Sequence, residues 1–82
     1  MSEVEVLLFG AAADRVGARR AEIPVRDGTT LGDLWPVLTE RLPGLAPMRS
    51  NLAFAVNGEY ARMEDKVSPG DEIAVLPPVS GG

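Results

Sequence analysis

The residues of this chain with the clearest chemical potential are its last two, Gly81 and Gly82. They follow a stiff, extended-favouring stretch made of Pro77, Pro78, Val79 and Ser80. At about 3.3–3.6 Å per residue, the six residues after Leu76 could reach roughly 20 Å. Because glycine has no Cβ atom, such a tip could enter a narrow channel of another protein and present its terminal carboxyl group there. We therefore predict that the carboxyl group of Gly82 is the reactive group of the molecule.

A terminal carboxylate needs activation before it can react as an acyl donor. It is ionised at neutral pH, and the anion is a poor electrophile. Acyl adenylation driven by a nucleotide is the obvious route, so we expect ATP to be used by an activating enzyme and not held by this domain. A bare Gly-Gly ending can also be irrelevant to function, but the prolines before it favour the functional interpretation.

The composition excludes several other kinds of site. The chain has 82 residues and contains neither cysteine nor histidine, so it lacks thiol nucleophiles, the commonest general base and the commonest metal ligand. No carboxylate pattern suggests a metal cage, and we predict no bound metal or cofactor. Eight basic and twelve acidic residues give a net charge of −4, which argues against nucleic-acid binding. The acidic start and the lack of an apolar run of about 20 residues predict a cytoplasmic protein without a membrane partner.

Alternation and helical spacing predict the elements that must position the tail. Residues 3–9, 20–25, 52–56, 59–62 and 72–76 alternate as strands. Pro24 indicates that the second strand lies at a sheet edge, and Asn57-Gly58 predicts a tight hairpin. Residues 11–16 predict one helical turn ending at Gly17, whereas residues 45–51 show no regular pattern.

The main helix is predicted over residues 30–42. Thr30 is a suitable N-cap, and an apolar stripe with spacings of three and four is formed by Leu31, Leu34, Leu38 and Leu42. Pro36 interrupts this pattern, since proline lacks a backbone donor. Either the helix bends there or, as we prefer, its regular part starts near Asp33 with Pro36 in the first turn.

These elements predict an α+β fold with two layers. The first and last strands are the most apolar, so we expect them to lie side by side and parallel at the centre of a mixed sheet of about five strands. One helix then covers one face, which is a ubiquitin-like β-grasp arrangement. We predict one domain over residues 1–76 and an extended tail over residues 77–82.

Alternation also predicts a partner-binding surface on the other face of the sheet. The side chains expected to face the helix are Val4, Val6, Leu8, Leu52, Phe54, Val56, Ile73 and Val75. Those expected to face outward are Leu7, Phe9, Ala53, Ala55, Ala74 and Leu76. Such an apolar outward face indicates an interaction site unless loops cover part of it. Together with the tail, we therefore predict partner contacts by Leu7, Phe9 and Leu76.

The ending from Asp71 to Gly82 resembles that of the molybdopterin synthase small-subunit (MoaD-type) family. Its members carry an acidic pair, an apolar strand, Pro-Pro, valine, serine or threonine, and Gly-Gly. The segment from Val4 to Gly10, the helix from Thr30 to Leu42 and the hairpin from Ala55 to Gly58 are also similar, so the resemblance covers essentially the whole chain. Pro36 within the helix departs from the family pattern.

This resemblance implies a sulfur carrier in molybdenum cofactor biosynthesis. A ubiquitin-activating-like enzyme would adenylate Gly82, a sulfur donor protein would convert it to a thiocarboxylate, and the tail would enter the large subunit of molybdopterin synthase. Sulfur would there pass to a cyclic pyranopterin precursor, and the large subunit would provide the catalytic side chains. This chain would thus be a sulfur-donating subunit without catalytic side chains of its own.

Three alternatives remain open at this point. The chain could carry sulfur for thiamine or another pathway. It could be a ubiquitin-like modifier joined through Gly82 to lysines of other proteins. It could also be a plain β-grasp binding module in which the tail has no role.

Overall fold

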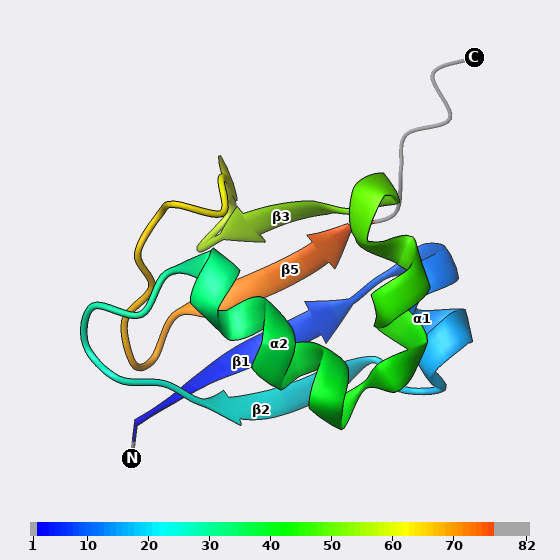
Figure 1. The fold of residues 1–82 in the computed structure, drawn as a ribbon, viewed down its shortest axis with the longest axis horizontal. Coiled ribbons are helices and arrows are strands. Elements are labelled where there is room, and N and C mark those ends of the chain that lie inside the picture. Colours follow the sequence, from blue (N-terminus) through cyan, green and yellow to red (C-terminus); the bar gives the residue numbers. More distant parts are fainter. Residues whose placement is uncertain (1, 77–82) are drawn as a thin grey trace.

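The computed structural model describes residues 2–76 (Figure 1). The predicted tail over residues 77–82 therefore lies outside the described residues. In chain order the elements are β1 (Glu3–Leu8), α1 (Gly10–Val16), β2 (Arg20–Pro24), α2 (Leu31–Arg41), the 3-10 helix η1 (Pro43–Asn51), β3 (Ala53–Val56), β4 (Glu59–Ala61) and β5 (Glu72–Leu76).

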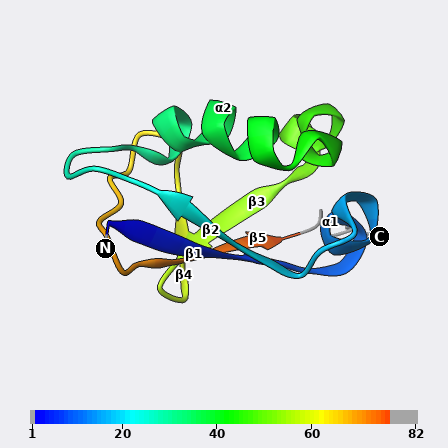
Figure 2. The same cartoon turned by 90° about the horizontal axis from the view of Figure 1, so that it is seen from below.

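The five strands form one mixed sheet in the order β2-β1-β5-β3-β4. The first and last strands pair in parallel, as predicted, and all other pairs are antiparallel. Figure 2 shows α2 and η1 in a layer on one side of this sheet. The arrangement confirms the predicted β-grasp topology and places β5 in the middle of the sheet.

The strand β2 lies at an edge of the sheet, as its proline predicts. The backbone N–H of Val25 donates to the carbonyl oxygen of Ser2 at 2.8 Å. Hydrogen-bonded and non-bonded positions alternate along an antiparallel pair, so the nitrogen of the preceding Pro24 is directed away from β1. The missing donor of Pro24 therefore removes no hydrogen bond from the ladder.

The helix α2 begins at Leu31, so the prediction of a regular helix starting near Asp33 is wrong. Thr30 is the N-cap, as predicted, and forms a reciprocal capping box with Asp33. The Thr30 side-chain oxygen accepts from the Asp33 N–H at 3.1 Å, and the Asp33 carboxylate accepts from the Thr30 N–H at 3.2 Å. Pro36 consequently lies inside the helix and not in its first turn.

A distant loop explains the early start of α2. The backbone N–H of Leu31 donates to the carbonyl oxygen of Asp65 at 2.9 Å, and that of Gly32 donates to the carbonyl oxygen of Met63 at 2.8 Å. The first N–H groups of a helix have no partners within the helix. Carbonyl groups far away in sequence supply these partners and fix the first turn.

Residues 43–51 form the helix η1, although the sequence predicted no regular structure for residues 45–51. Leu45 is completely buried and belongs to the core. At Gly44 an added Cβ would lie 2.9 Å from the carbonyl oxygen of Arg15, so only glycine permits this approach of η1 to α1. This packing, and not local propensity, holds the segment.

The turn between β3 and β4 follows the predicted hairpin signal. Asn57 and Gly58 both have positive φ, at 52° and 87°. The Asn57 side chain donates to the Asp71 carboxylate at 3.0 Å and accepts from the Glu72 N–H at 2.9 Å. The hairpin is thereby fastened to the start of β5, which fixes where the central strand begins.

The core lies between the sheet and the helices. The alternation along β1 and β5 is confirmed, because Val4, Val6, Ile73 and Val75 are at most 1% exposed. Phe54 is buried, and Leu52 and Val56 are half-buried and pack against the core. The helices contribute the buried side chains of Ala12, Leu31, Leu34, Leu38 and Leu45.

Candidate functional site

The end of β5 is the structural base from which the predicted tail begins. Leu76 is the last described residue, and it pairs with Ala53 of β3. On the other side of β5, Val75 pairs in parallel with Leu8 of β1. The chain therefore continues from a point held between two strands. The predicted reactive and tail residues themselves lie outside the described residues: Pro77, Pro78, Val79, Ser80, Gly81 and Gly82.

We call the face of the sheet opposite α2 the outer face. The register of the strands determines which side chains lie together on it. Leu7 pairs with Ala74, Ala74 with Ala55, and Ala55 with Tyr60. Directly paired residues point to the same side of a sheet. The structure therefore brings together Leu7, Ala55 and Ala74, as predicted, and adds Tyr60 from the edge strand β4.

The outer face is less exposed than the sequence predicts. Leu7, Ala74 and Leu76 are half-buried, and Ala55 is only 7% exposed. Side chains on neighbouring strands lie about 5 Å apart and shield one another. Phe9 at 45% and Tyr60 at 78% are the exposed large apolar side chains among the described residues. An incoming partner would meet these two aromatic rings first.

Tyr60 was missed by the sequence interpretation, which assigned no face to β4. A usable signal exists in the chain, because a two-residue Asn57-Gly58 hairpin fixes the register of the two strands beside it. That register places Tyr60 opposite Ala55. The face of the edge strand could therefore have been deduced from the turn.

Phe9 lies where β1 passes into α1. Its backbone is extended (φ −125°, ψ 153°), and its N–H donates to the carbonyl oxygen of Val75 at 3.3 Å. Phe9 is the N-cap of α1, but its side chain makes no capping hydrogen bond. Beside it is an open hollow of about 410 Å³, lined by Leu7, Leu8, Phe9, Gly10, Ala13, Asp14 and Arg19. The Phe9 ring therefore lies beside this hollow, at the end of the sheet where the parallel strands β1 and β5 both finish and where Leu76 also lies.

The far half of the outer face is acidic. Glu5 pairs with Glu22 on one side and with Glu72 on the other, so the three carboxylates form one row. Arg20 forms an ion pair with Glu5. Leu76 lies four positions after Glu72, which corresponds to about 13 Å along the strand. The outer face is therefore apolar towards the tail and negatively charged towards its other end.

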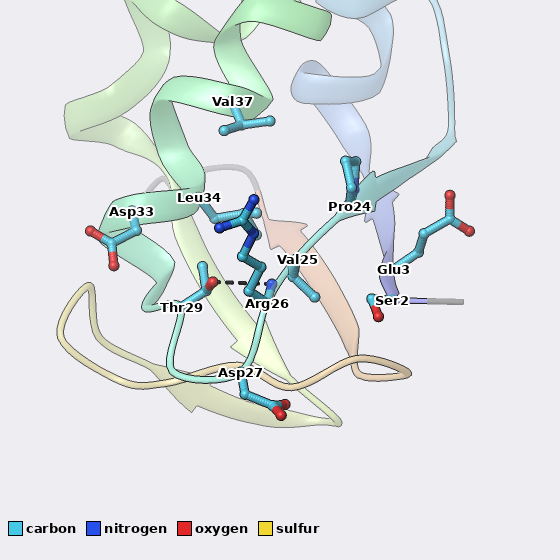
Figure 3. Close-up of a pocket in the computed structure, with 10 residues that line it drawn as sticks. All are labelled: Ser2, Glu3, Pro24, Val25, Arg26, Asp27, Thr29, Asp33, Leu34 and Val37. Atoms are coloured by element: carbon cyan, nitrogen blue, oxygen red, sulfur yellow. Dashed lines mark hydrogen bonds between the residues drawn. The ribbon is translucent and has the colours of Figure 1, made fainter.

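A larger hollow of about 870 Å³ lies elsewhere, between β2 and the start of α2 (Figure 3). The Arg26 side chain extends along it towards Leu34, and the Arg26 N–H donates to the Thr29 side-chain oxygen at 3.3 Å. Its ionisable lining consists of Glu3, Asp27, Asp33 and Arg26. This set offers neither a nucleophile beside a base nor an electrophilic centre. Among the described residues, none of the predicted site residues (Leu7, Phe9 and Leu76) lines it.

The described residues also bear on two other kinds of function. Within residues 2–76, no group of three or more potential ligand side chains could hold a metal ion. In the same part of the chain, no helix has the length and apolar character needed to cross a membrane.

Comparison with known proteins places this geometry among related chains. A model of the ThiS family matches residues 6–82. The human protein named molybdopterin synthase sulfur carrier subunit is 42% identical, with 100% of this chain and 97% of that protein aligned. SAMP1, the small archaeal modifier protein 1 of Haloferax volcanii, is 31% identical in sequence; its crystal structure aligns with a TM-score of 0.86 over 98% of this chain and 99% of that chain.

A solved complex provides a neighbour bound to another protein. It is the complex of subunits 1 and 2 of molybdopterin-converting factor from Helicobacter pylori. Its matching chain is 30% identical, with a TM-score of 0.72 over 98% of this chain and 99% of that chain. These neighbours, together with the strand order, confirm the predicted ubiquitin-like fold.

Proposed function

Because this chain belongs to the ThiS family, we propose that it is the sulfur carrier subunit of a molybdopterin synthase. The observation that carries the proposal is the position of Leu76. It ends the central strand beside an apolar outer face, and a six-residue sequence ending in Gly81-Gly82 continues from there. A rigid domain would thus dock on a partner while its tail delivers the terminal carboxyl group.

The docking partner in this proposal is the large subunit of the synthase. The Helicobacter complex supports it, because that structure joins a similar chain to a second subunit. The apolar outer face also supports it, since Phe9 and Tyr60 are large exposed aromatic side chains, a type enriched in protein interfaces. Docking would bring these rings out of water and direct the tail into the large subunit.

The chemistry begins with activation of the Gly82 carboxylate. In an adenylating enzyme, a carboxylate oxygen attacks the α-phosphorus of ATP, and pyrophosphate leaves. Hydrosulfide delivered by a donor protein then displaces AMP from the acyl carbon: a carbon–sulfur bond replaces the carbon–oxygen bond to AMP, and loss of the sulfur-bound proton leaves the thiocarboxylate. Because the chain has no cysteine or histidine, nucleophilic and acid–base groups for these steps come from partners.

In the large subunit, the thiocarboxylate sulfur attacks a carbon of the pyranopterin precursor, and an oxygen substituent of that carbon leaves as the carbon–sulfur bond forms. Water then cleaves the bond between sulfur and the acyl carbon, which returns the Gly82 carboxylate. Each chain carries one sulfur atom on its single C-terminus, whereas a dithiolene contains two. Two loaded carriers are therefore consumed for each product molecule.

The test is to detect the thiocarboxylate on Gly82. The chain is incubated with its activating enzyme, a sulfur donor and ATP, alkylated with a thiol reagent, and cleaved for mass spectrometry. Total mass is insufficient, because exchange of oxygen for sulfur resembles oxidation of one of the three methionines. Without cysteine in the chain, alkylation has no other thiol target. A label on the fragment ending in Gly82 is expected, and a variant lacking Gly82 serves as the matched control. An unlabelled wild-type fragment would contradict the proposal.

The acceptor of the sulfur is tested separately. Loaded carrier is mixed with the large subunit and the pyranopterin precursor, and the dithiolene product is measured by mass spectrometry. Two carriers should be spent per product. Stable thiocarboxylate in the presence of both would instead favour a carrier for thiamine or another pathway.

A second candidate function, protein modification, is favoured by the similarity to the small archaeal modifier protein. The same activated carboxyl group could acylate lysine amines of other proteins. The last basic residue of the chain is Lys66, so trypsin would leave residues 67–82 attached to a modified lysine. Peptides that carry this branch in cell extracts would support modification, and their absence beside a labelled Gly82 would support the carrier alone.

A further inference from the structure

The turn between β3 and β4 contains a pair of residues that can react without an enzyme. Asn57 is followed by Gly58, and both residues are exposed. Because glycine has no Cβ atom, its backbone nitrogen is unhindered and can attack the carbonyl carbon of the preceding asparagine side chain. The chain contains two asparagines and no glutamine, and the other asparagine, Asn51, precedes the bulky Leu52. Asn57 is therefore the side chain with the greatest chemical tendency to lose its amide nitrogen.

The reaction needs water as its only co-reactant. The Gly58 nitrogen loses its proton and forms a bond to Cγ of Asn57, while the bond from Cγ to Nδ2 breaks and Nδ2 leaves with a proton as ammonia. Water then opens the cyclic imide at either carbonyl group, which leaves aspartate or isoaspartate at position 57. An open hollow of about 450 Å³ beside the turn gives water access to this site. Overall, a neutral amide is replaced by a carboxylate and ammonia is released.

In the folded chain, the Asn57 amide is held by the start of β5. Its Nδ2 donates to Oδ1 of Asp71 at 3.0 Å, and its Oδ1 accepts from the Glu72 N–H at 2.9 Å. The backbone N–H of Asn57 also donates to the carbonyl oxygen of Glu72 at 2.8 Å. We call these three hydrogen bonds the Asn57 clamp. Asp71 is itself fixed, because its other carboxylate oxygen accepts from the Ser68 N–H at 2.8 Å.

The clamp opposes the first step of the reaction. Ring closure joins Cγ to the Gly58 nitrogen and expels Nδ2, so the hydrogen bond to Asp71 is lost and the acceptor for the Glu72 N–H is displaced. The bond to Asp71 has a charged acceptor and is therefore of the stronger kind. The side chain must leave both partners before its carbon can be attacked.

We propose that Asn57 is a deamidation site that the Asn57 clamp protects in the folded chain, so that its conversion irreversibly marks chains whose turn has opened. The product cannot form the clamp again, because a carboxylate has no N–H group to donate to Asp71. Like charges close together repel one another, and Glu59 and Asp65 line the same hollow with Lys66 as its one basic residue. Deamidation therefore also loosens the attachment of the hairpin to the central strand.

The experiment follows conversion of Asn57 in the full chain at neutral pH by mass spectrometry of proteolytic fragments. A synthetic peptide of residues 53–61 in the same buffer is the reference that lacks the clamp. We expect the folded chain to react about thirtyfold more slowly than the peptide, or slower still, since two side-chain hydrogen bonds must be broken. Asp71→Ala removes one of these bonds and should react about tenfold faster than the wild type.

Gly44→Ala is the matched control, because it disturbs the packing of η1 on α1 and leaves the clamp intact. Its rate should remain within about threefold of the wild type, as expected for independent sites. Thermal unfolding shows that each variant is folded at the temperature of incubation. Asn57→Asp reproduces the main change in the product, and its unfolding midpoint should lie about 4–8 °C below that of the wild type.

Each measurement can contradict the inference. A folded wild-type chain that reacts as fast as the peptide would show that the fold gives no protection. Equal rates for Asp71→Ala and the wild type, or equal acceleration by Asp71→Ala and Gly44→Ala, would overturn the role of the clamp. An unchanged unfolding midpoint for Asn57→Asp would overturn the loosening of the hairpin. The sulfur-carrier proposal is tested separately, by the label on Gly82.

Discussion

Replacement of Phe9 by aspartate should weaken docking strongly while leaving the domain folded. Phe9 is 45% exposed, so about 90 Å² of a ring residue of roughly 200 Å² is available to a partner. At about 25 cal/mol per Å², burial of this area contributes about 2 kcal/mol to binding. That value corresponds to a Kd about 30-fold higher for the variant, and the desolvation of a new charge can only increase the loss.

The same substitution affects stability through two opposing terms. The half of Phe9 that is already buried amounts to about 110 Å², and its loss costs at most about 3 kcal/mol. Phe9 is also the N-cap of α1 and has the extended backbone that a capping residue needs. Aspartate there can accept a hydrogen bond from the first turn, which restores about 1 kcal/mol relative to alanine. The net loss of about 2 kcal/mol is tolerable for a domain with roughly 4–12 kcal/mol of stability.

A pair of variants tests this reasoning. In calorimetric titration, Phe9→Ala should raise the Kd for the large subunit about 30-fold because it lacks the ring, and Phe9→Asp should raise it at least as much because its charge must also be desolvated. Phe9→Asp should nevertheless unfold about 4–8 °C above Phe9→Ala, since only aspartate caps α1. Binding by Phe9→Asp within threefold of the wild type would refute the docking role. A Phe9→Ala variant at least as stable as Phe9→Asp would refute the capping argument.

Three further substitutions test the helices, each read out as the free energy of unfolding in urea. Thr30→Ala removes the acceptor for the Asp33 N–H and should cost about 1 kcal/mol; an unchanged value would mean that the loop contacts alone start α2. Pro36→Ala should stabilise the domain by about 1 kcal/mol or more, because it restores a donor inside α2; destabilisation would contradict this. Gly44→Ala would bring a methyl group 2.9 Å from the Arg15 carbonyl oxygen and should cost more than about 1 kcal/mol; wild-type stability would show that η1 can move away freely.

The sequence was sufficient where local pattern and sheet geometry agree. Alternation in β1 and β5 identified the two central strands, since their buried side chains recur at every second position. The Asn57-Gly58 pair identified the hairpin because its positive φ angles suit those residue types. Pro24 identified the edge strand, because a proline there removes no ladder bond.

The failures occurred where distant segments decide the local structure. The first turn of α2 is held by carbonyl groups of Met63 and Asp65, which no pattern near Leu31 indicates. The helix η1 contains two prolines and lacks a clear apolar period, yet one of its own residues, Leu45, is fully buried in the core. Both cases depend on tertiary contacts that overrule local propensity.

Local sequence pattern predicted only part of the candidate site. Alternation correctly placed Leu7, Ala55 and Ala74 on one face, because the side-chain period of a strand is two. Their degree of burial could not be obtained in this way, since it depends on which strands lie next to each other. The acidic row formed by Glu5, Glu22 and Glu72 could not be predicted for the same reason, because its members come from three strands whose order in the sheet brings them together.

The inner face of the sheet stabilises the fold, whereas the outer face is the one proposed to bind a partner. In β1, Val6 is fully buried against the helices, whereas its neighbour Leu7 is half-buried on the outer face. In β5, Val75 and Ala74 differ in the same way. A single residue step along a strand therefore separates a buried position that holds the fold from one that we propose to contact a partner. This division allows the outer face to be shaped for the large subunit while the core stays unchanged, and it allows binding variants to be studied in folded protein.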